Sequence, residues 1–251
     1  MYTPEIYWDN VAAAIEQRSH DNIIAGDDEP YYVYKRKRLL TLFKEIDVNK
    51  KHLLEFGCGP GGNLLYFSAA GATVSGVDIS AKMLRIAAKR LAGKKVELQK
   101  INSHLLPYPS DKFDMVFTVT VLQHNTNEES LQKIIKEIAR VCKKDLYLFE
   151  RIEHTLKGHE SNTGRPIAYY QQLLLAEGFK LTSTKFIPLQ ASYTVCGIIR
   201  KLFSDKHSQE GKPMHKMAVF LQKLFLPFTS LLDLIIPSNR DVARLHFQRK
   251  M

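Results

Sequence analysis

Cysteine is scarce in this sequence. The 251 residues include three cysteines, Cys58, Cys142 and Cys196, which are far apart, odd in number and never in C-x-x-C spacing. A disulfide framework, a zinc site or an iron–sulfur cluster needs paired or clustered cysteines, so the pattern argues against all three. We therefore expect no metal site and a reducing, cytoplasmic location.

Internal repeats, heptads and low-complexity runs are also missing, which argues against solenoid, coiled-coil and disordered classes. The first residues lack a basic start followed by an apolar core, so we expect no secretory signal. Apolar residues make up 45% of the chain and charged residues 25%. This composition is typical of a globular domain.

Long uninterrupted apolar runs are lacking as well. The best candidate, residues 217–237, contains Lys223, Pro227 and Asp233, which argue against a membrane-spanning helix. Because proline removes a helical N–H, we predict two short helices broken at Pro227 that cover the core or a dimer interface. An alternative is an apolar surface that makes peripheral contact with a membrane or a lipid-linked substrate. The oligomeric state stays open.

Acidic residues are outnumbered by basic ones. Lysine and arginine total 36 against 26 acids, which gives a formal net charge of +10. Such an excess favours an anionic partner, such as a nucleotide-linked substrate, RNA or an anionic membrane, although a solvated basic surface has the same composition. No RNA-binding module is recognisable and the basic residues are scattered, so nucleic acid is not expected as a partner.

The rhythm of the chain predicts its fold class. Residues 1–50 show helical patterns around a polar break at 21–30, and from residue 51 short apolar runs alternate with amphipathic stretches. This alternation predicts a parallel sheet with helices on both faces. Predicted strands are 52–56, 72–78, 96–101, 113–119, 145–150, 179–188 and 242–250, and predicted helices are 7–18, 31–46, 62–70, 80–91, 128–142 and 167–177.

A glycine-rich loop is the strongest local signal. Gly57, Gly59 and Gly61 follow a strand and precede a helix, and Asp78 ends the next strand, where a carboxylate can accept from ribose hydroxyls. With Gly62 the loop also fits G-x-G-x-x-G, so a nicotinamide-dependent oxidoreductase is an alternative. Pro60 removes one N–H from a pyrophosphate cradle, and the charge of Glu55 would repel a pyrophosphate but suits a ligand with a cationic end.

Four motifs in order carry a resemblance over about residues 50–150. They are Glu55-x-Gly57-x-Gly59-x-Gly61, then Gly76 to Ser80 with Met83, then Ile101 to Pro109 leading into Phe113 to Phe117, and finally Val121 to His124. With these motifs the chain resembles the class I S-adenosylmethionine (SAM)-dependent methyltransferases of the small-molecule type. Asn102 is a departure, since the family usually has Asp there, but an amide oxygen can still accept from an adenine amino group.

The resemblance implies SAM as the cofactor and assigns the following roles. Glu55 and the backbone of Gly57, Cys58, Gly59 and Gly61 would hold the methionine part, Asp78 the ribose, Ile79 and Met83 the adenine faces, and Asn102 and Ser103 the adenine edge. Thr118, Val119 and Leu122 would line the methionine side. A cluster of Tyr31, Tyr32, Tyr34, Lys35 and Arg38 would close over SAM, with Tyr34 as a contact, or grip an anionic substrate; a solvated amphipathic helix would have the same pattern.

The fold implied is α/β, a doubly wound seven-stranded, mostly parallel sheet with an antiparallel last strand. We expect four parts: an N-terminal helical lid over residues 1–50, a Rossmann-like SAM-binding core over 51–189, a helical insertion over 190–240, and the final strand of the core over 241–251. The lid and the insertion would build the substrate pocket.

Three residues are candidates for the catalytic base. His124 follows the fourth strand at the carboxyl edge of the sheet, where ligands bind, and its usual pKa suits proton transfer. Glu150 and His154 follow the fifth strand at the same edge. Alternatively, His124 only packs or caps, and residues 150–154 form a solvated loop.

The sequence therefore predicts methyl transfer from SAM to a hydroxyl or amine of a small or sugar-like metabolite. The acceptor would be anionic or linked to a glycan or lipid. The alternatives are an RNA methyltransferase, a nicotinamide-dependent oxidoreductase, or a module that binds SAM without catalysis.

Overall fold

A seven-stranded sheet forms the centre of the protein. The computed structural model describes residues 3–16, 29–102, 104–159, 161–203 and 214–250. The strand order is β3-β2-β1-β4-β5-β9-β8, and only β9 runs antiparallel to its neighbours. The predicted fold class is thus confirmed. The strands are β1 His52–Phe56, β2 Thr73–Asp78, β3 Val96–Lys100, β4 Phe113–Val119, β5 Cys142–Ile152, β8 Phe179–Phe186 and β9 Asp241–Arg249.

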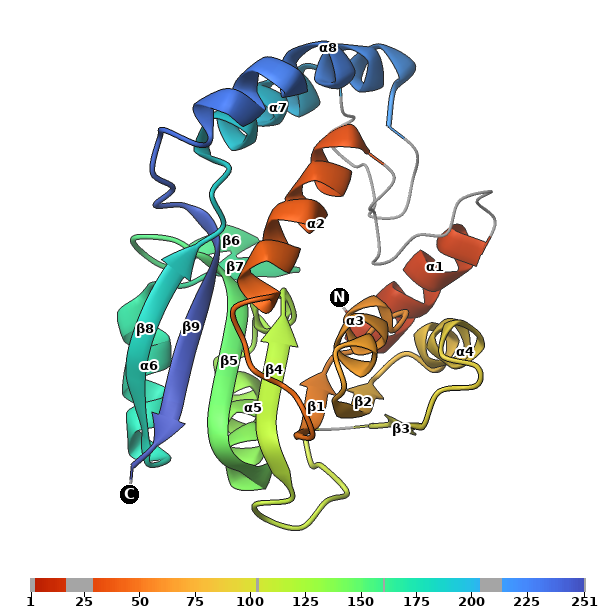
Figure 1. Ribbon diagram of the computed structural model, residues 1–251, viewed down its shortest axis with the longest axis vertical. Helices are drawn as coiled ribbons and strands as arrows, with labels where there is room; N and C mark the ends of the chain where they lie inside the picture. The colour runs from red at the N-terminus through yellow and green to blue at the C-terminus, as the bar shows by residue number, and fades with distance from the viewer. Residues whose placement is uncertain (1–2, 17–28, 103, 160, 204–213, 251) are drawn as a thin grey trace.

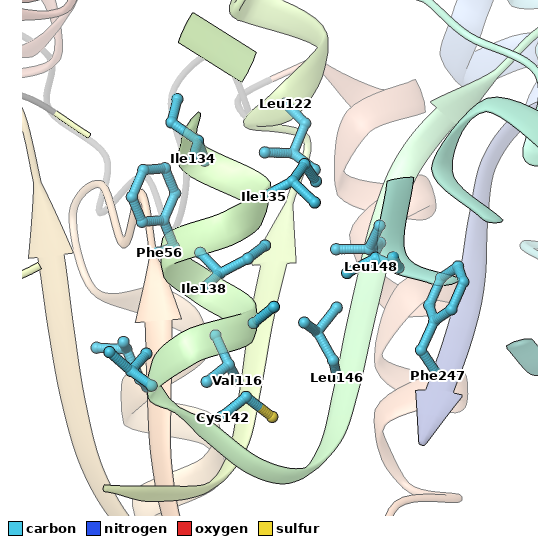
Figure 2. Packing of buried hydrophobic residues seen from close by; sticks show 14 of the residues in the cluster. Phe56, Val116, Leu122, Ile134, Ile135, Ile138, Cys142, Leu146, Leu148 and Phe247 are labelled. Atoms are coloured by element: carbon cyan, nitrogen blue, oxygen red, sulfur yellow. The ribbon is translucent and has the colours of Figure 1, made fainter. Parts of the chain in front are cut away.

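Helices cover both faces of this sheet (Figure 1). Side chains of α5 (Glu128–Val141) and α6 (Ile167–Ala176) pack on one face, and Figure 2 shows Ile134, Ile135 and Ile138 of α5 against Val116 and Leu148 of the strands. The other face is covered by α2 (Pro30–Phe43), α3 (Gly62–Ala69) and α4 (Ala81–Arg90). The central strands are therefore apolar on both faces, as a doubly wound sheet requires.

N-terminal capping residues explain where α4 and α5 begin. The Ser80 hydroxyl accepts the N–H of Met83 at the start of α4, and the Asn127 side chain accepts the N–H of Ser130 at the start of α5. Each of these side chains satisfies one N–H that the first helical turn leaves unpaired. The caps fix the start of α4 directly after β2 and the start of α5 after the turn that follows β4.

The two N-terminal helices contact different neighbours. Val11, Ala12 and Ile15 of α1 (Pro4–Glu16) pack against Met83 of α4, whereas α2 contacts α7 (Gln190–Phe203) and α8 (Lys216–Leu232). Part of the predicted first helix and of the loop at 21–30 lies outside the described residues.

Two features between the core strands differ from expectation. A small hairpin of β6 (Lys157–His159) and β7 (Asn162–Gly164) follows β5 and was not predicted.

The predicted helix break at Pro227 was wrong, because α8 continues through this residue. Hydrogen bonds on both sides hold this helix in place: Gln222 accepts the N–H of Tyr31, and Thr229 bonds to Ser192 of α7. These contacts compensate for the missing proline N–H.

No helix in the described ranges combines the length and apolarity needed to cross a membrane.

Candidate functional site

A large cavity opens at the carboxyl ends of β1, β2 and β4. Its volume is about 820 Å³, within the range of small-molecule sites. β1 pairs with β2 on one side and with β4 on the other, so the connections leave β1 in opposite directions there. Open α/β sheets bind ligands at such a switch point. Helices α1, α2 and α7 contribute further parts of the wall, including Trp8, Arg36 and Tyr193.

The glycine loop forms one wall of this cavity. Gly57 has a φ of 74° and Gly59 of 49°, and the N–H groups of Gly57 and Cys58 both donate to the Val77 carbonyl, at 2.8 and 3.0 Å. A Cβ atom at Gly57 would lie 2.5 Å from Cγ2 of Val121. Glycine is therefore required at 57 both for its left-handed backbone and for the close approach of the turn after β4.

Glu55 brings a buried carboxylate to the cavity wall. Its Oε1 accepts from Nδ2 of Asn63 at 2.6 Å, and Arg36 of α2 donates to the Asn63 side-chain oxygen. Within the described residues, Oε2 of Glu55 has no hydrogen-bond partner. Burial raises the pKa of Glu55 to about 8, which outweighs the opposing effects of the Asn63 hydrogen bond and the Arg36 charge. Such a carboxylate calls for a cationic partner from a ligand.

Asp78 lies across the glycine loop from Glu55. Its two oxygens accept the N–H groups of Gly59 and Ser80, both at 2.8 Å. Burial raises the pKa of Asp78 to about 6, although these backbone hydrogen bonds favour the charged form. A carboxylate has about four acceptor positions, so two remain for a pair of ligand hydroxyls.

His124 lines the cavity at the end of β4 and is buried. Its Nδ1 lies 2.9 Å from the Ser161 carbonyl, its Nε2 lies 3.1 Å from Nε2 of Gln123, and Trp8 contacts the ring edge-on at 5.0 Å. A carbonyl only accepts, so Nδ1 carries the proton and Nε2 is the basic nitrogen. This is the tautomer that a general base needs.

The other two predicted catalytic residues lie outside the cavity lining. Glu150 is fully buried below the cavity, where it accepts from the Thr118 hydroxyl at 2.7 Å and from the N–H groups of Val121 and Gln123. Burial raises the pKa of Glu150 to about 7. Its carboxylate thus shapes the turn after β4. His154 is exposed on the connection after β5 and lies outside the cavity lining. Neither Glu150 nor His154 belongs to the cavity lining.

The structure separates the predicted cofactor contacts into two groups. The cavity lining includes Glu55, Gly57, Cys58, Gly59, Asp78, Ile79, Met83 and Val119. Gly61, Asn102, Thr118 and Leu122 lie outside that lining, and Ser103 lies outside the described residues. Gly61 begins α3 with a φ of 80°, and Asn102 accepts from Lys100.

Tyr34 also differs from expectation. Its hydroxyl donates to Asp233 at 3.0 Å and faces α8, because it lies on the outer side of α2. The cavity side of this helix instead presents Tyr32, Lys35 and Arg36. Tyr34 therefore lies outside the cavity lining, and its contact with the cofactor stays a prediction.

Sequence reasoning singled out Tyr32 and Lys35 of α2 but missed their partners in the cavity wall, which come from α7, β9 and the residue before α2. Lys35 pairs with Asp241 at 2.6 Å, Arg200 lies 3.5 Å from Glu29, and the Tyr32 hydroxyl accepts from Arg200. Asp241 holds a φ of 67°, which is uncommon outside glycine and marks a constrained position. No spacing in the sequence connects these residues, since they come from three distant segments.

Arg165 is another buried residue that the sequence did not indicate. Its guanidinium donates to the carbonyls of Leu122 at 3.2 Å and Asn125 at 2.8 Å, and pairs with Glu128 at 2.7 Å. It thereby fixes the turn after β4 that carries His124. A lone arginine before a helix gives no pattern from which this role could be predicted.

Comparison with known proteins agrees with this geometry. The profile of a family described as "Methyltransferase domain" matches residues 53–145. The ubiquinone biosynthesis O-methyltransferase of Coxiella burnetii is 27% identical over 127 residues, covering 50% of this chain and 53% of that protein. These matches support a class I SAM-dependent methyltransferase.

Solved structures with this methyltransferase fold align over nearly the whole chain. The [4+2]-cyclase SpnF superposes with a TM-score of 0.67 at 17% identity and covers 98% of this chain and 96% of that chain. Magnesium protoporphyrin IX methyltransferase (ChlM) from Synechocystis PCC 6803 with bound SAH gives 0.62 at 17% identity, covering 98% of each. At this identity the likeness shows the fold alone. The chain spans about half the length of the curated relative, so its activity is a separate question.

Proposed function

We propose that this protein binds SAM in the cavity and transfers its methyl group to a hydroxyl or amine of a small, amphiphilic metabolite. The observation that carries the proposal is the partnerless Oε2 of Glu55 on the cavity wall, one strand from Asp78. A buried anion and a pair of free acceptor positions fit the ammonium group and the ribose hydroxyls of SAM.

The chain's own residues would hold the cofactor as follows. Glu55 would accept from the ammonium group, Asp78 from the ribose hydroxyls, and Ile79 and Met83 would contact the adenine. These assignments remain proposals that rest on the cavity lining. SAM itself supplies a methyl group on a positively charged sulfur. The protein contributes alignment of donor and acceptor, which can lower a barrier by about 7–11 kcal/mol.

His124 is the residue we assign as general base. Its Nε2 faces the Gln123 amide, whose Oε1 is buried and has no partner within the described residues. That ring nitrogen has a single in-plane lone pair, so the Gln123 amide must turn aside before Nε2 can take the proton of the acceptor. Gln123 would in this way control access to the base, which makes it a positioning residue. A placed base is worth about 10²–10⁴-fold in rate.

The acceptor side of the cavity is amphiphilic. Tyr32, Lys35 and Arg200 supply charge and hydrogen bonds, whereas Ile187 and Tyr193 supply apolar surface. One similar protein is named as a ubiquinone biosynthesis O-methyltransferase. We therefore favour an acceptor that is partly apolar and anionic over a free sugar. We also propose that the chain has four parts. They are a lid at residues 1–50, a core at 51–189, an insertion at 190–240 and a last strand at 241–251.

The other functions are less well supported. A nicotinamide dinucleotide would place its pyrophosphate beside Glu55, against the sign of that charge. The likeness to a cyclase, however, means that the fold by itself does not decide the reaction.

Isotope transfer tests the activity. Purified protein is incubated with methyl-labelled SAM and a metabolite extract, and labelled products are identified by mass. We expect one labelled product class that disappears with Asp78→Asn, which keeps the size of the side chain but replaces one acceptor oxygen by a donor. A cofactor that binds without any labelled product would refute methyl transfer and leave a SAM-binding module.

A further inference from the structure

The helix pair α7–α8 is apolar on its outer side and polar toward the protein. Seventeen large apolar side chains are exposed in the described part of the chain, and twelve of them lie between residues 198 and 236. Figure 1 shows α7 and α8 side by side at the end of the molecule farthest from the C-terminus. We call this surface the hairpin face; it consists of Ile198, Leu202, Met217, Phe220, Leu224, Phe225, Phe228, Leu231, Leu232, Leu234, Ile235 and Ile236.

The orientation of α8 is the reverse of that of an ordinary surface helix. Met217, Phe220, Leu224, Phe228 and Leu231 follow one another at intervals of three or four residues, so they form one stripe, and all are exposed. The opposite side, which is buried, carries Ala218, Gln222, Thr229 and Asp233. A helix normally turns its apolar stripe toward the core.

The polar side of α8 is fixed by specific hydrogen bonds. Gln222 accepts the N–H of Tyr31, and Asp233 accepts from the Ser192 hydroxyl at 2.6 Å and from the Tyr34 hydroxyl. Rotating the helix to bury its phenylalanines would leave these buried polar groups unpaired. The apolar stripe is thus held outward by the fold.

Other parts of the chain carry too little apolar surface to cover this face. The segments 17–28 and 204–213 contain only Ile23 and Ile24 as large apolar residues. An exposed apolar surface of this extent indicates a partner outside the chain.

Charge identifies the kind of partner. The exposed cations of these helices and of the segment after them are Lys201, Lys216, Lys223 and Arg240. In the described residues from 190 to 240 the only acidic residue is Asp233, which is buried. The sequence of segment 204–213 contains two acidic residues and two lysines, so their formal charges sum to zero. Apolar side chains surrounded by unopposed cations match an anionic lipid surface. A second copy of this chain would instead bring like charges together.

We propose that the hairpin face binds the surface of an anionic membrane, so that an acceptor embedded in lipid enters the cavity from the bilayer side. The route is short, because Tyr193 and Arg200 of α7 line the cavity while Ile198 and Leu202 of the same helix belong to the hairpin face. The lipid-borne acceptor rests on the proposed function, whereas the membrane binding does not.

Vesicle flotation tests the binding directly. The full-length protein is mixed with phosphatidylcholine vesicles, with or without about 30% phosphatidylglycerol, and the bound fraction is measured. We expect binding to the anionic vesicles and at least about tenfold weaker binding for Phe228→Glu or Phe220→Glu, since each replaces an inserted ring by a charge. Lys216→Glu should weaken binding to anionic vesicles by about fivefold or more.

Leu156→Glu is the matched control, because Leu156 is also an exposed apolar residue but lies on the connection after β5, outside the hairpin face. It should float like the wild type. All variants are first checked for an unchanged melting temperature and an unchanged shift on adding SAM, so loss of folding or of SAM binding is distinguished from loss of membrane binding.

Three results would overturn the proposal. They are absence of flotation, equal binding to neutral and anionic vesicles, and a dimer in light scattering that Phe228→Glu dissociates while vesicles stay unbound. The last result would assign the face to a second copy of the chain.

Discussion

Glu55→Gln removes the ability of this buried side chain to become negatively charged and changes little else. The amide has nearly the size of the carboxylate and keeps an oxygen that can accept from Asn63, as Oε1 of Glu55 does. If Glu55 holds the ammonium group of SAM, this change should weaken SAM binding and also alter its pH dependence. The second effect distinguishes a charge contact from a merely structural role.

The size of the pH effect follows from the pKa of about 8. Only about 1% of Glu55 is ionised at pH 6, and about 10% is ionised at pH 7. Because SAM would bind the ionised carboxylate, the affinity for SAM should rise roughly tenfold, or by about 1.4 kcal/mol, between pH 6 and pH 7. Asp78, with a pKa of about 6, adds a further factor of less than about two. In Glu55→Gln we expect the affinity for SAM to change only by the factor of less than about two that Asp78 contributes.

Calorimetry at pH 6 and pH 7 measures both effects. The matched ligand is 5′-methylthioadenosine, which keeps the ribose and adenine but lacks the charged amino-acid end, and whose affinity should change by less than about twofold in either protein. A SAM affinity that is equally pH-dependent in the wild type and in Glu55→Gln would refute the assignment of Glu55.

Glu55 should also make the free protein less stable at neutral and higher pH. In the folded protein the pKa of Glu55 lies above the ordinary value of 4.5. Its favourable contribution to the free energy of unfolding is therefore present below pH 4.5 and is lost as the pH rises through about 8. Glu55→Gln should therefore melt at a higher temperature than the wild type at pH 8 without ligand, although SAM raises its melting temperature less. A lower melting temperature for Glu55→Gln would show that burial of the charge is not costly.

Three further substitutions test separate parts of the site. Gly57→Ala should lower the free energy of unfolding by about 1–3 kcal/mol in urea titrations and abolish the SAM-induced shift, because the backbone is left-handed and Val121 lies against it; wild-type stability would contradict this. His124→Gln should lower turnover by about 10²-fold or more while the SAM dissociation constant stays within about threefold, and normal turnover would remove His124 as the base. Arg165→Met should cost about 2–4 kcal/mol by the same titration, since the carbonyls of Leu122 and Asn125 lose their donor; a loss below about 0.5 kcal/mol would mean that this guanidinium is not needed.

The core of the fold could be predicted because its signals are local. Short apolar runs predicted the strands, and glycines and helix caps predicted where their connections lie. The alternation in residues 242–250 predicted the last strand, which lies antiparallel between β5 and β8. The glycine loop and Asp78 were found for the same reason, since strand ends at one sheet edge lie together.

The missed features depend on contacts between distant segments. Periodicity shows that α8 is a helix with an apolar stripe, but which side is buried depends on hydrogen bonds from Tyr31, Tyr34 and Ser192. Glu150 lies at the right edge of the sheet, yet the turn after β4 folds over it and uses its carboxylate. The three-residue strands of the β6–β7 hairpin are too short to give a period.

The central claim is that the cavity between Glu55 and Asp78 is a SAM site. A crystal structure of the protein soaked with SAM and, separately, with NAD tests it most directly. We expect SAM alone in the cavity, with its ammonium group within hydrogen-bonding distance of Glu55 and its ribose hydroxyls within hydrogen-bonding distance of Asp78. A dinucleotide in that position, or SAM bound without contact to Glu55, would contradict it.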